Sequence, residues 1–341
     1  MEEFVKQETK KFLKMPSELE NIDGVHKEIN ITLMEDGMPR AVAFFDIDKT
    51  LAELKIVHSQ TIKKLLKEFL GKEDKDLENV EEVYFKGFKL GNSFREFDRM
   101  NGIYNLGHEE WIDPEVYIKE RLNKNREEID GGGSEDHMIA KAYLDRYADM
   151  ASSVADEIYK NNPEEFESSK IKPIFALAKL YKALGIPMFG MTANGKKFVG
   201  TIAKYIGLSD IFIDIATDED MIGGGKEIII PKIIERLEKK GVKVPKDRIV
   251  LVGDSLRGDI GSGSKFKENA ENKEIKIKGI LVMKDKKDLA EMHDLISHNP
   301  ELKKILENTD TEAFVVENVP MDKNGDPLLF SGGRKDFLTK L

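Results

Sequence analysis

The sequence of 341 residues contains no cysteine. This absence excludes disulfide bonds, thiolate catalysis, and zinc or iron–sulfur sites that need sulfur ligands. The sequence also lacks an apolar run of about 18 residues, the length of a transmembrane helix. Its first residues are charged and amphipathic, unlike a signal peptide. We therefore expect a cytoplasmic protein with no membrane partner.

An excess of positive charge is missing as well. The formal net charge is −10, and 35% of the residues are charged. A nucleic-acid backbone or an anionic membrane surface is not expected as a partner, because it would repel this chain. The hydrophobic content of 40% is enough for a sizeable core. The length indicates a core domain with an insertion or a second module.

A pair of aspartates follows the first strongly apolar run of the chain. Residues 41–45 are all apolar, and Asp46, Asp48 and Thr50 follow them. Two carboxylates so close together repel each other, and each needs a cation or a shared proton to stay in place. For these two aspartates alone, a chance match in a surface turn is the alternative explanation.

From residue 171 onward, short apolar segments alternate with segments of helical periodicity. Strands are predicted at residues 40–45, 187–191, 211–215, 248–252 and 277–283. Helices are predicted at residues 174–184, 196–206, 231–240 and 288–307. Apolar strands separated by helices predict an α/β fold with a doubly wound parallel sheet, covered on both faces.

The chain before this alternation has a different character. Residues 2–14 predict a short exposed helix, and residues 27–34 predict a hairpin with the strand at 40–45. Residues 58–169 carry apolar side chains at helical spacing and predict a mostly helical segment. A glycine-rich loop at residues 131–134 interrupts it.

The end of the chain predicts a β-hairpin at residues 313–330, because residues 322–325 form a favourable turn sequence. Its role is open among three alternatives. The hairpin extends the sheet, forms a dimer contact, or covers the ligand-binding crevice.

Polar side chains follow several of the predicted strands. Ligands of open parallel sheets bind beyond the carboxyl ends of the strands, so we expect these side chains to share one crevice. They are Asp46, Asp48 and Thr50, then Thr192 and Asn194, then Lys226 in a glycine-rich loop, and finally Asp254 and Asp259. Taken singly, Thr192 fits a helix cap, Lys226 a surface lysine and Asp254 a turn residue.

Four segments together resemble the motifs of the haloacid dehalogenase superfamily, in the order of that family. They are residues 44–51 (FFDIDKTL), Thr192, Lys226 and residues 252–259 (VGDSLRGD). The resemblance covers residues 38–57 and 171–285, and it implies the Rossmann-like core of that superfamily.

The resemblance also implies a role for each of these residues. Asp46 would be the nucleophile that attacks a phosphomonoester and forms an aspartyl-phosphate. Asp48 would act as general acid and then as general base. Thr192 would donate a hydrogen bond to the phosphoryl group, and Lys226 would hold Asp46. Mg²⁺ would be bound by Asp46, the backbone carbonyl of Asp48, and Asp254.

Further residues are assigned supporting roles by the same resemblance. Asp259 and Thr50 would orient the site from behind, and Asn194 would contact the substrate. Lys232 is a weaker rival to Lys226, because it falls inside a predicted helix and not in the glycine-rich loop.

The longest stretch between two motifs separates Asp46 from Thr192. A cap domain, which sets specificity in this superfamily, therefore has to be inserted there, and the pattern makes it helical. The predicted division is a core of residues 1–57 and 172–341 with a cap of residues 58–171. This order resembles the C1-capped branch, which includes phosphoserine-phosphatase-like and sugar-phosphatase-like members.

Two cationic residues bear on the substrate. Arg99 lies in a segment that resembles the substrate-binding cap segment of phosphoserine phosphatases. Those enzymes carry a glutamate for the substrate amine where this chain has Lys55, so phosphoserine is not expected. Lys55 and Arg99 together favour a substrate with a second anionic group.

The function predicted from the sequence is Mg²⁺-dependent hydrolysis of a small phosphorylated metabolite. A phosphomutase or phosphotransferase on the same core is an alternative, as is a non-catalytic binding or regulatory protein of this fold. The metal-binding pattern argues against a dehalogenase, and the absence of apolar spans argues against an ion pump. The sequence does not indicate the oligomeric state.

Overall fold

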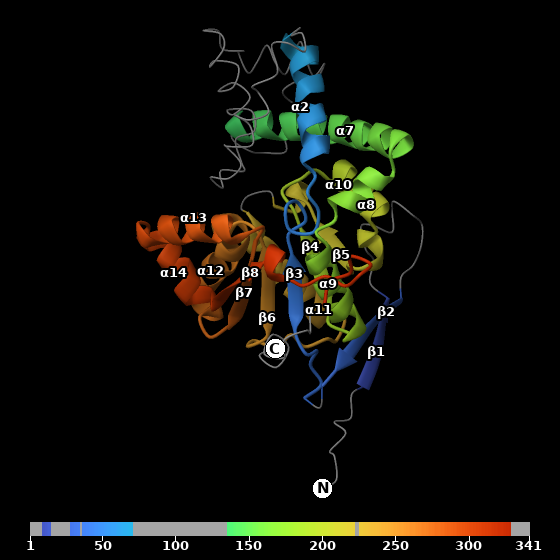
Figure 1. The fold of residues 1–341 in the computed structure, drawn as a ribbon. Coiled ribbons are helices and arrows are strands. Elements are labelled where there is room, and N and C mark those ends of the chain that lie inside the picture. Colours follow the sequence, from blue (N-terminus) through green and yellow to red (C-terminus); the bar gives the residue numbers. More distant parts are fainter. Residues whose placement is uncertain (1–8, 15–27, 35, 71–134, 222–224, 329–341) are drawn as a thin grey trace. The chain divides into compact units, whose positions relative to one another are not determined.

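The computed structural model describes residues 9–14, 28–34, 36–70, 135–221 and 225–328 (Figure 1). The chain divides into two compact units. Unit 1 comprises Met1–Glu53, Glu167–Thr192 and Ile206–Leu341, and unit 2 comprises Leu54–Phe166 and Ala193–Tyr205. No described helix has the length and apolar character needed to cross a membrane.

A six-stranded sheet with strand order β5-β4-β3-β6-β7-β8 forms the centre of unit 1 (Figure 1). Every neighbouring pair in it is parallel. The strands are β3 (Val42–Phe45), β4 (Met188–Met191), β5 (Asp214–Ala216), β6 (Ile249–Gly253), β7 (Ile277–Met283) and β8 (Thr311–Val315). The predicted α/β fold with a doubly wound parallel sheet is confirmed.

The helices of unit 1 follow the strands in sequence. They are α9 (Lys172–Ala183), α11 (Ile229–Lys239), α12 (Gly261–Glu268), α13 (Lys286–Ser297) and α14 (Pro300–Thr309). Short helical turns are η3 (Leu208–Asp210), η4 (Asp218–Met221), η5 (Lys226–Ile228), η6 (Leu256–Ile260), η7 (Ala270–Asn272) and η8 (Val316–Asn318).

The single helix predicted at residues 288–307 is wrong, because two helices occupy this region. The side chain of Asn299 caps α14 and accepts hydrogen bonds from the backbone N–H groups of Glu301 and Leu302, at 3.0 and 3.3 Å. Pro300 stands at the first position of α14. Proline has no backbone N–H to continue α13, so the chain stops one helix and begins another there.

Alternate residues of the strands pack on opposite faces of the sheet. Phe44, Phe189 and Leu251 belong to one buried cluster with residues of α11, α12 and α14. Phe45 contacts Tyr181 of α9, with the ring centroids 6.0 Å apart. Because both faces are covered, the central strands must be apolar on both sides, which explains the continuous apolar run before Asp46.

The N-terminal region differs from both predictions made for it. Residues 9–14 are not helical but form β1 (Thr9–Lys14), which pairs antiparallel with β2 (Glu28–Leu33) in a separate two-stranded sheet (Figure 1). Residues 2–8 lie outside the described part of the chain. The predicted hairpin of β2 with β3 is wrong, because only one bridge, Leu33 to Pro39, joins the two segments. The apolar β3 pairs with β4 and β6 inside unit 1, whereas β2 pairs with β1.

The predicted C-terminal hairpin is also replaced by another arrangement. Residues 311–315 form β8, an edge strand parallel to β7. The turn at residues 322–325 does form: the Asp322 N–H donates to the Asp326 carbonyl at 2.8 Å, and Gly325 has a φ of 76°. A single antiparallel bridge, Met321 to Pro327, joins the two arms of this turn, and the Leu328 N–H donates to the Pro320 carbonyl at 2.8 Å, so the arms pair over only a few residues. Residues 329–330 lie outside the described part.

Unit 2 is helical where it is described. It contains α2 (Lys55–Leu70), α7 (Glu135–Asn161), the start of α8 (Glu164–Ser169) and nearly all of α10 (Lys196–Ile206). The loop predicted at residues 131–134 lies outside the described residues. The division into a core of 1–57 and 172–341 and a cap of 58–171 stays a prediction. Unit 2 includes residues 193–205, which that division assigns to the core.

Candidate active site

The sheet register brings together the residues that follow β3 and β6. Phe45 pairs with Val252, and the Asp46 N–H donates to the Val252 carbonyl at 2.8 Å. Asp46 and Asp254 therefore leave two adjacent parallel strands at the same carboxyl edge. This is the edge at which parallel sheets bind ligands.

Three carboxylates converge at this edge. Asp46, Asp254 and Asp259 each offer an oxygen atom, and these atoms lie within 4.8 Å of one another. Asp46 and Asp259 are buried, whereas Asp254 is partly exposed. An oxygen-only cluster of anionic ligands suits a hard divalent cation such as Mg²⁺. The residues present thus fit the metal that the sequence predicts.

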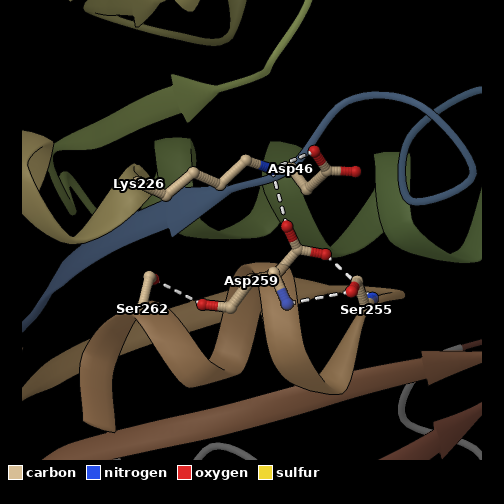
Figure 2. A network of polar contacts seen from close by, with 6 residues as sticks. Asp46, Lys226, Ser255, Asp259 and Ser262 are labelled. Carbon is tan, nitrogen blue, oxygen red and sulfur yellow. Dashed lines mark hydrogen bonds and ion pairs between the residues drawn. The ribbon is translucent and has the colours of Figure 1, made fainter. Parts of the chain in front are cut away.

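The π-helical turn η6 carries Asp259 back towards β6. Ser255 caps this turn and accepts a hydrogen bond from the Gly258 N–H at 2.9 Å. The Asp259 carboxylate in turn accepts from the Ser255 N–H at 2.8 Å (Figure 2). A Cβ atom on Gly253 would lie 2.3 Å from the Cβ of Asp259. Glycine at the end of β6 is what allows the Asp259 side chain to reach the cluster.

Lys226 links two of the carboxylates. Its Nζ lies 2.5 Å from Asp46 Oδ1 and 2.6 Å from Asp259 Oδ1 (Figure 2). The lysine comes from η5, which leads into α11. The rival Lys232 is exposed and donates to the Asp220 backbone carbonyl at 2.8 Å. Lys226 is therefore the lysine that contacts the carboxylate cluster.

The close packing of these charges shifts the pKa values of the site. Burial raises the pKa of Asp46 to about 7, helped by the charges of Asp259 and Asp48 and opposed by Lys226. Burial also raises the pKa of Asp254, and the charges of Asp259 and Asp46 add to this effect. Burial alone would lower the pKa of Lys226, but the charges of Asp259 and Asp46 outweigh it and raise that pKa. The lysine therefore stays protonated, whereas the raised pKa values of Asp46 and Asp254 mean that the site disfavours ionising all three carboxylates at once, a cost that a bound cation would offset.

The loop after β3 is tightly folded. Lys49 has a φ of 59° and donates its N–H to the Ala52 carbonyl at 2.7 Å, and Leu51 donates to Ile47 at 2.8 Å. This left-handed conformation is unusual for a residue with a side chain, and it indicates that the loop is held by its surroundings. Asp48 is partly exposed in this loop, whereas Thr50 is completely buried.

Thr192 follows β4, the other neighbour of β3. It is buried, and its N–H donates to the Ala216 carbonyl at 3.0 Å. Of the other predicted contacts, Asn194 and Lys55 belong to unit 2. Arg99 lies outside the described residues. The roles assigned to all these residues stay predictions.

The carboxylate of Asp259, which the sequence predicts to orient the site, lies in the cluster and binds Lys226 directly. Its predicted role stays a prediction. Sequence reasoning overlooked Gly253, although a glycine directly after a buried strand was a readable sign of close packing.

A family comparison agrees with the geometry. The sequence model of the haloacid dehalogenase-like hydrolases matches residues 41–267, which is more than half of the chain. This protein therefore belongs to the haloacid dehalogenase-like hydrolase family. No curated protein sequence matches the chain.

Several solved structures resemble the chain at low identity. YfnB from Bacillus subtilis bound to magnesium shares 15% identity, with 75% of this chain and 98% of that chain covered and a TM-score of 0.42. CbbY from Rhodobacter sphaeroides in complex with phosphate shares 17%, covering 71% and 86%, with a TM-score of 0.34. β-Phosphoglucomutase from Clostridium difficile shares 16%, covering 73% and 87%, with a TM-score of 0.39.

Proposed function

We propose that this protein is a Mg²⁺-dependent phosphomonoester hydrolase that acts on a small phosphorylated metabolite through an aspartyl-phosphate on Asp46. The observation that carries the proposal is the contact between Lys226 and Asp46 beside Asp254 and Asp259. A buried carboxylate held by a cation at a ligand-binding edge has the arrangement that a nucleophile needs. The family membership supports a phosphatase-type reaction.

In the first step, a carboxylate oxygen of Asp46 forms a bond to phosphorus, and the bond between phosphorus and the leaving oxygen breaks. Asp48, as a carboxylic acid, gives its proton to that leaving oxygen, so an alcohol departs. Lys226 binds Oδ1 of Asp46, which leaves Oδ2 for the attack (Figure 2). Lys226 also favours the ionised form of Asp46, which is the form that attacks.

In the second step, a water molecule attacks the phosphorus of the aspartyl-phosphate. Asp48, now ionised, takes a proton from this water, and the bond between phosphorus and Asp46 breaks. The products are inorganic phosphate, a free Asp46 carboxylate and the protonated Asp48 with which the cycle began. The proton count closes without any further group.

The remaining residues position the phosphoryl group and neutralise its charge. Thr192 donates a hydrogen bond from its hydroxyl to the phosphoryl group, and Asp259 keeps Lys226 beside Asp46. Asp46 and Asp254, with the backbone carbonyl of Asp48, would hold Mg²⁺. When bound, the cation supplies positive charge that offsets the charge of the phosphoryl oxygens and of the carboxylates.

The proposed substrate class rests on two positively charged side chains. Lys55 and Arg99 favour a phosphomonoester with a second anionic group, and Asn194 contacts the substrate in this proposal. Lys55→Glu tests this assignment, because it should reduce turnover of phosphorylated acids relative to phosphorylated amines. Unchanged selectivity would remove Lys55 from the proposal.

The experiment that tests the function measures phosphate release from a panel of phosphomonoesters with Mg²⁺ and with EDTA. Release by the intact protein should need Mg²⁺ and should disappear in Asp46→Asn. Asp48→Asn is the matched control, because it should still transfer the phosphoryl group from an aryl phosphate whose leaving group needs no proton. That variant should accumulate covalently bound phosphate, because water then lacks its base.

Other outcomes point to other functions. Formation of an isomeric sugar phosphate without phosphate release would identify the mutase alternative. Turnover that persists in Asp46→Asn would exclude Asp46 as the nucleophile.

A further inference from the structure

The helix α10 follows Thr192 in sequence but belongs to the other unit. Thr192 is the last residue of its segment in unit 1, and its backbone N–H donates to Ala216 of the same unit. Ala193 begins the segment that belongs to unit 2. Two predicted substrate contacts, Thr192 and Asn194, are therefore carried by different units although they lie two residues apart.

A row of polar contacts fixes α10 to α7 within unit 2. The contact between the Ser152 and Thr201 hydroxyls measures 2.6 Å, and the salt bridge of Lys197 with Asp149 measures 2.7 Å. Further along, the Tyr205 hydroxyl donates to Asp156. The residues of α10 in this row are Lys197, Thr201 and Tyr205, spaced four apart, so each turn of the helix is joined to α7.

Aromatic contacts reinforce the two ends of α10. The ring of Tyr205 stacks on Tyr159 of α7, with centroids 3.9 Å apart and an angle of 7°, and it lies 5.3 Å from Phe166 of α8. Near the other end, Phe198 packs edge-on against His58 of α2, with centroids 5.5 Å apart. These rings tie α10 to three helices that begin in unit 2.

We propose that the row of contacts between α7 and α10 makes Ser152, Thr201, Asp156 and Tyr205 positioning residues for residues 193–195, the loop that leads into α10 and contains Asn194. Because the row fixes α10 within unit 2, it also fixes the start of the helix, which directly follows this loop. This inference rests on the proposed function for the roles of Thr192 and Asn194.

Two variants break the row with little other disturbance. Ser152→Ala removes one contact and leaves the Thr201 hydroxyl its bond to the Lys197 carbonyl at 3.1 Å. Tyr205→Phe removes the bond to Asp156 and keeps the ring that stacks on Tyr159. Each should lower kcat by up to about fivefold, the equivalent of one hydrogen bond.

Matched controls exist for both variants. Ser153→Ala changes the neighbouring serine of α7, which is exposed. Tyr181→Phe removes a buried hydroxyl of α9 that has no hydrogen-bond partner among the described residues and takes no part in the row. Both controls should leave kcat unchanged. An equal loss of kcat in the controls would overturn the inference, because the effect would then not be specific to the row.

A double-mutant cycle with Asn194→Ala tests whether the row affects kcat through the loop of residues 193–195. Adding Tyr205→Phe to Asn194→Ala should cause no further loss of kcat if the row acts through the 193–195 loop. Additive losses would overturn the inference.

Amide hydrogen exchange provides a readout that does not depend on catalysis. Ser152→Ala and Tyr205→Phe should speed exchange in residues 193–198 and leave β4 unchanged, and the controls should change neither. Unchanged exchange in residues 193–198 would overturn the inference even if the protein released phosphate. Faster exchange in a protein that releases no phosphate would refute the proposed function while upholding the attachment of α10.

Discussion

Replacing Asp46 by asparagine should make the folded protein more stable in EDTA, although the same change abolishes the proposed chemistry. Burial raises the pKa of this carboxyl from 3.8 to about 7, aided by the charges of Asp259 and Asp48. A site that gathers repelling carboxylates for catalysis does so at the expense of stability. Asparagine removes one of the charges and can still accept a hydrogen bond from Lys226.

The sign and size of the effect follow from the pKa shift. The unfolded chain loses the Asp46 proton near pH 3.8, whereas the folded protein keeps it until about pH 7. The stability that this group contributes is complete below pH 4 and is lost as the pH rises through about 7. Above that pH the loss reaches up to about 4 kcal/mol. Asparagine is neutral throughout, so the free energy of unfolding of Asp46→Asn should exceed that of the intact protein by up to this amount at pH 8.

Urea unfolding in EDTA at pH 8 and pH 5 measures the difference in free energy of unfolding between Asp46→Asn and the intact protein. This difference should be smaller at pH 5. Addition of Mg²⁺ should stabilise the intact protein more than the variant, because the variant has lost a charged ligand. Asp214→Asn is the control, since Asp214 is also buried but pairs with Arg236 at 2.5 Å. That variant should be destabilised. A similar destabilisation of Asp46→Asn at pH 8 in EDTA would refute the reasoning.

Three further predictions concern single positions. Gly253→Ala should lower kcat about a hundredfold, because its Cβ would lie 2.3 Å from the Cβ of Asp259 and displace that side chain; a rate near that of the intact protein would contradict this. Lys226→Met should reduce phosphate release about a hundredfold and the free energy of unfolding by about 3 kcal/mol, whereas the exposed Lys232→Met should change neither. Tyr181→Phe should raise the free energy of unfolding by about 1 kcal/mol in urea denaturation, because the buried Tyr181 hydroxyl has no hydrogen-bond partner among the described residues; a decrease would indicate an ordered water at that hydroxyl.

Local sequence patterns were sufficient to predict the parallel sheet and most of its strands. The predicted strand at residues 277–283 and the predicted helix at 196–206 have the bounds of β7 and α10. Strands buried on both faces must be apolar at every position, and that requirement can be read without knowing their neighbours. The same logic located Asp46 and Asp254, because a polar residue directly after such a strand marks the carboxyl edge of the sheet.

Pairing and packing over long sequence distances could not be read in this way. The partner of β2 is β1 and not β3, and the helix α10 belongs to unit 2 although the alternation of strands and helices gives no sign of it. The approach of Asp259 to Lys226 depends on the π-helical turn η6 and on the missing side chain of Gly253. Each of these outcomes depends on contacts between residues far apart in sequence or on an exact backbone path. Hydrophobic periodicity reports only the burial of each position, so it carries no information about such contacts or about the backbone path.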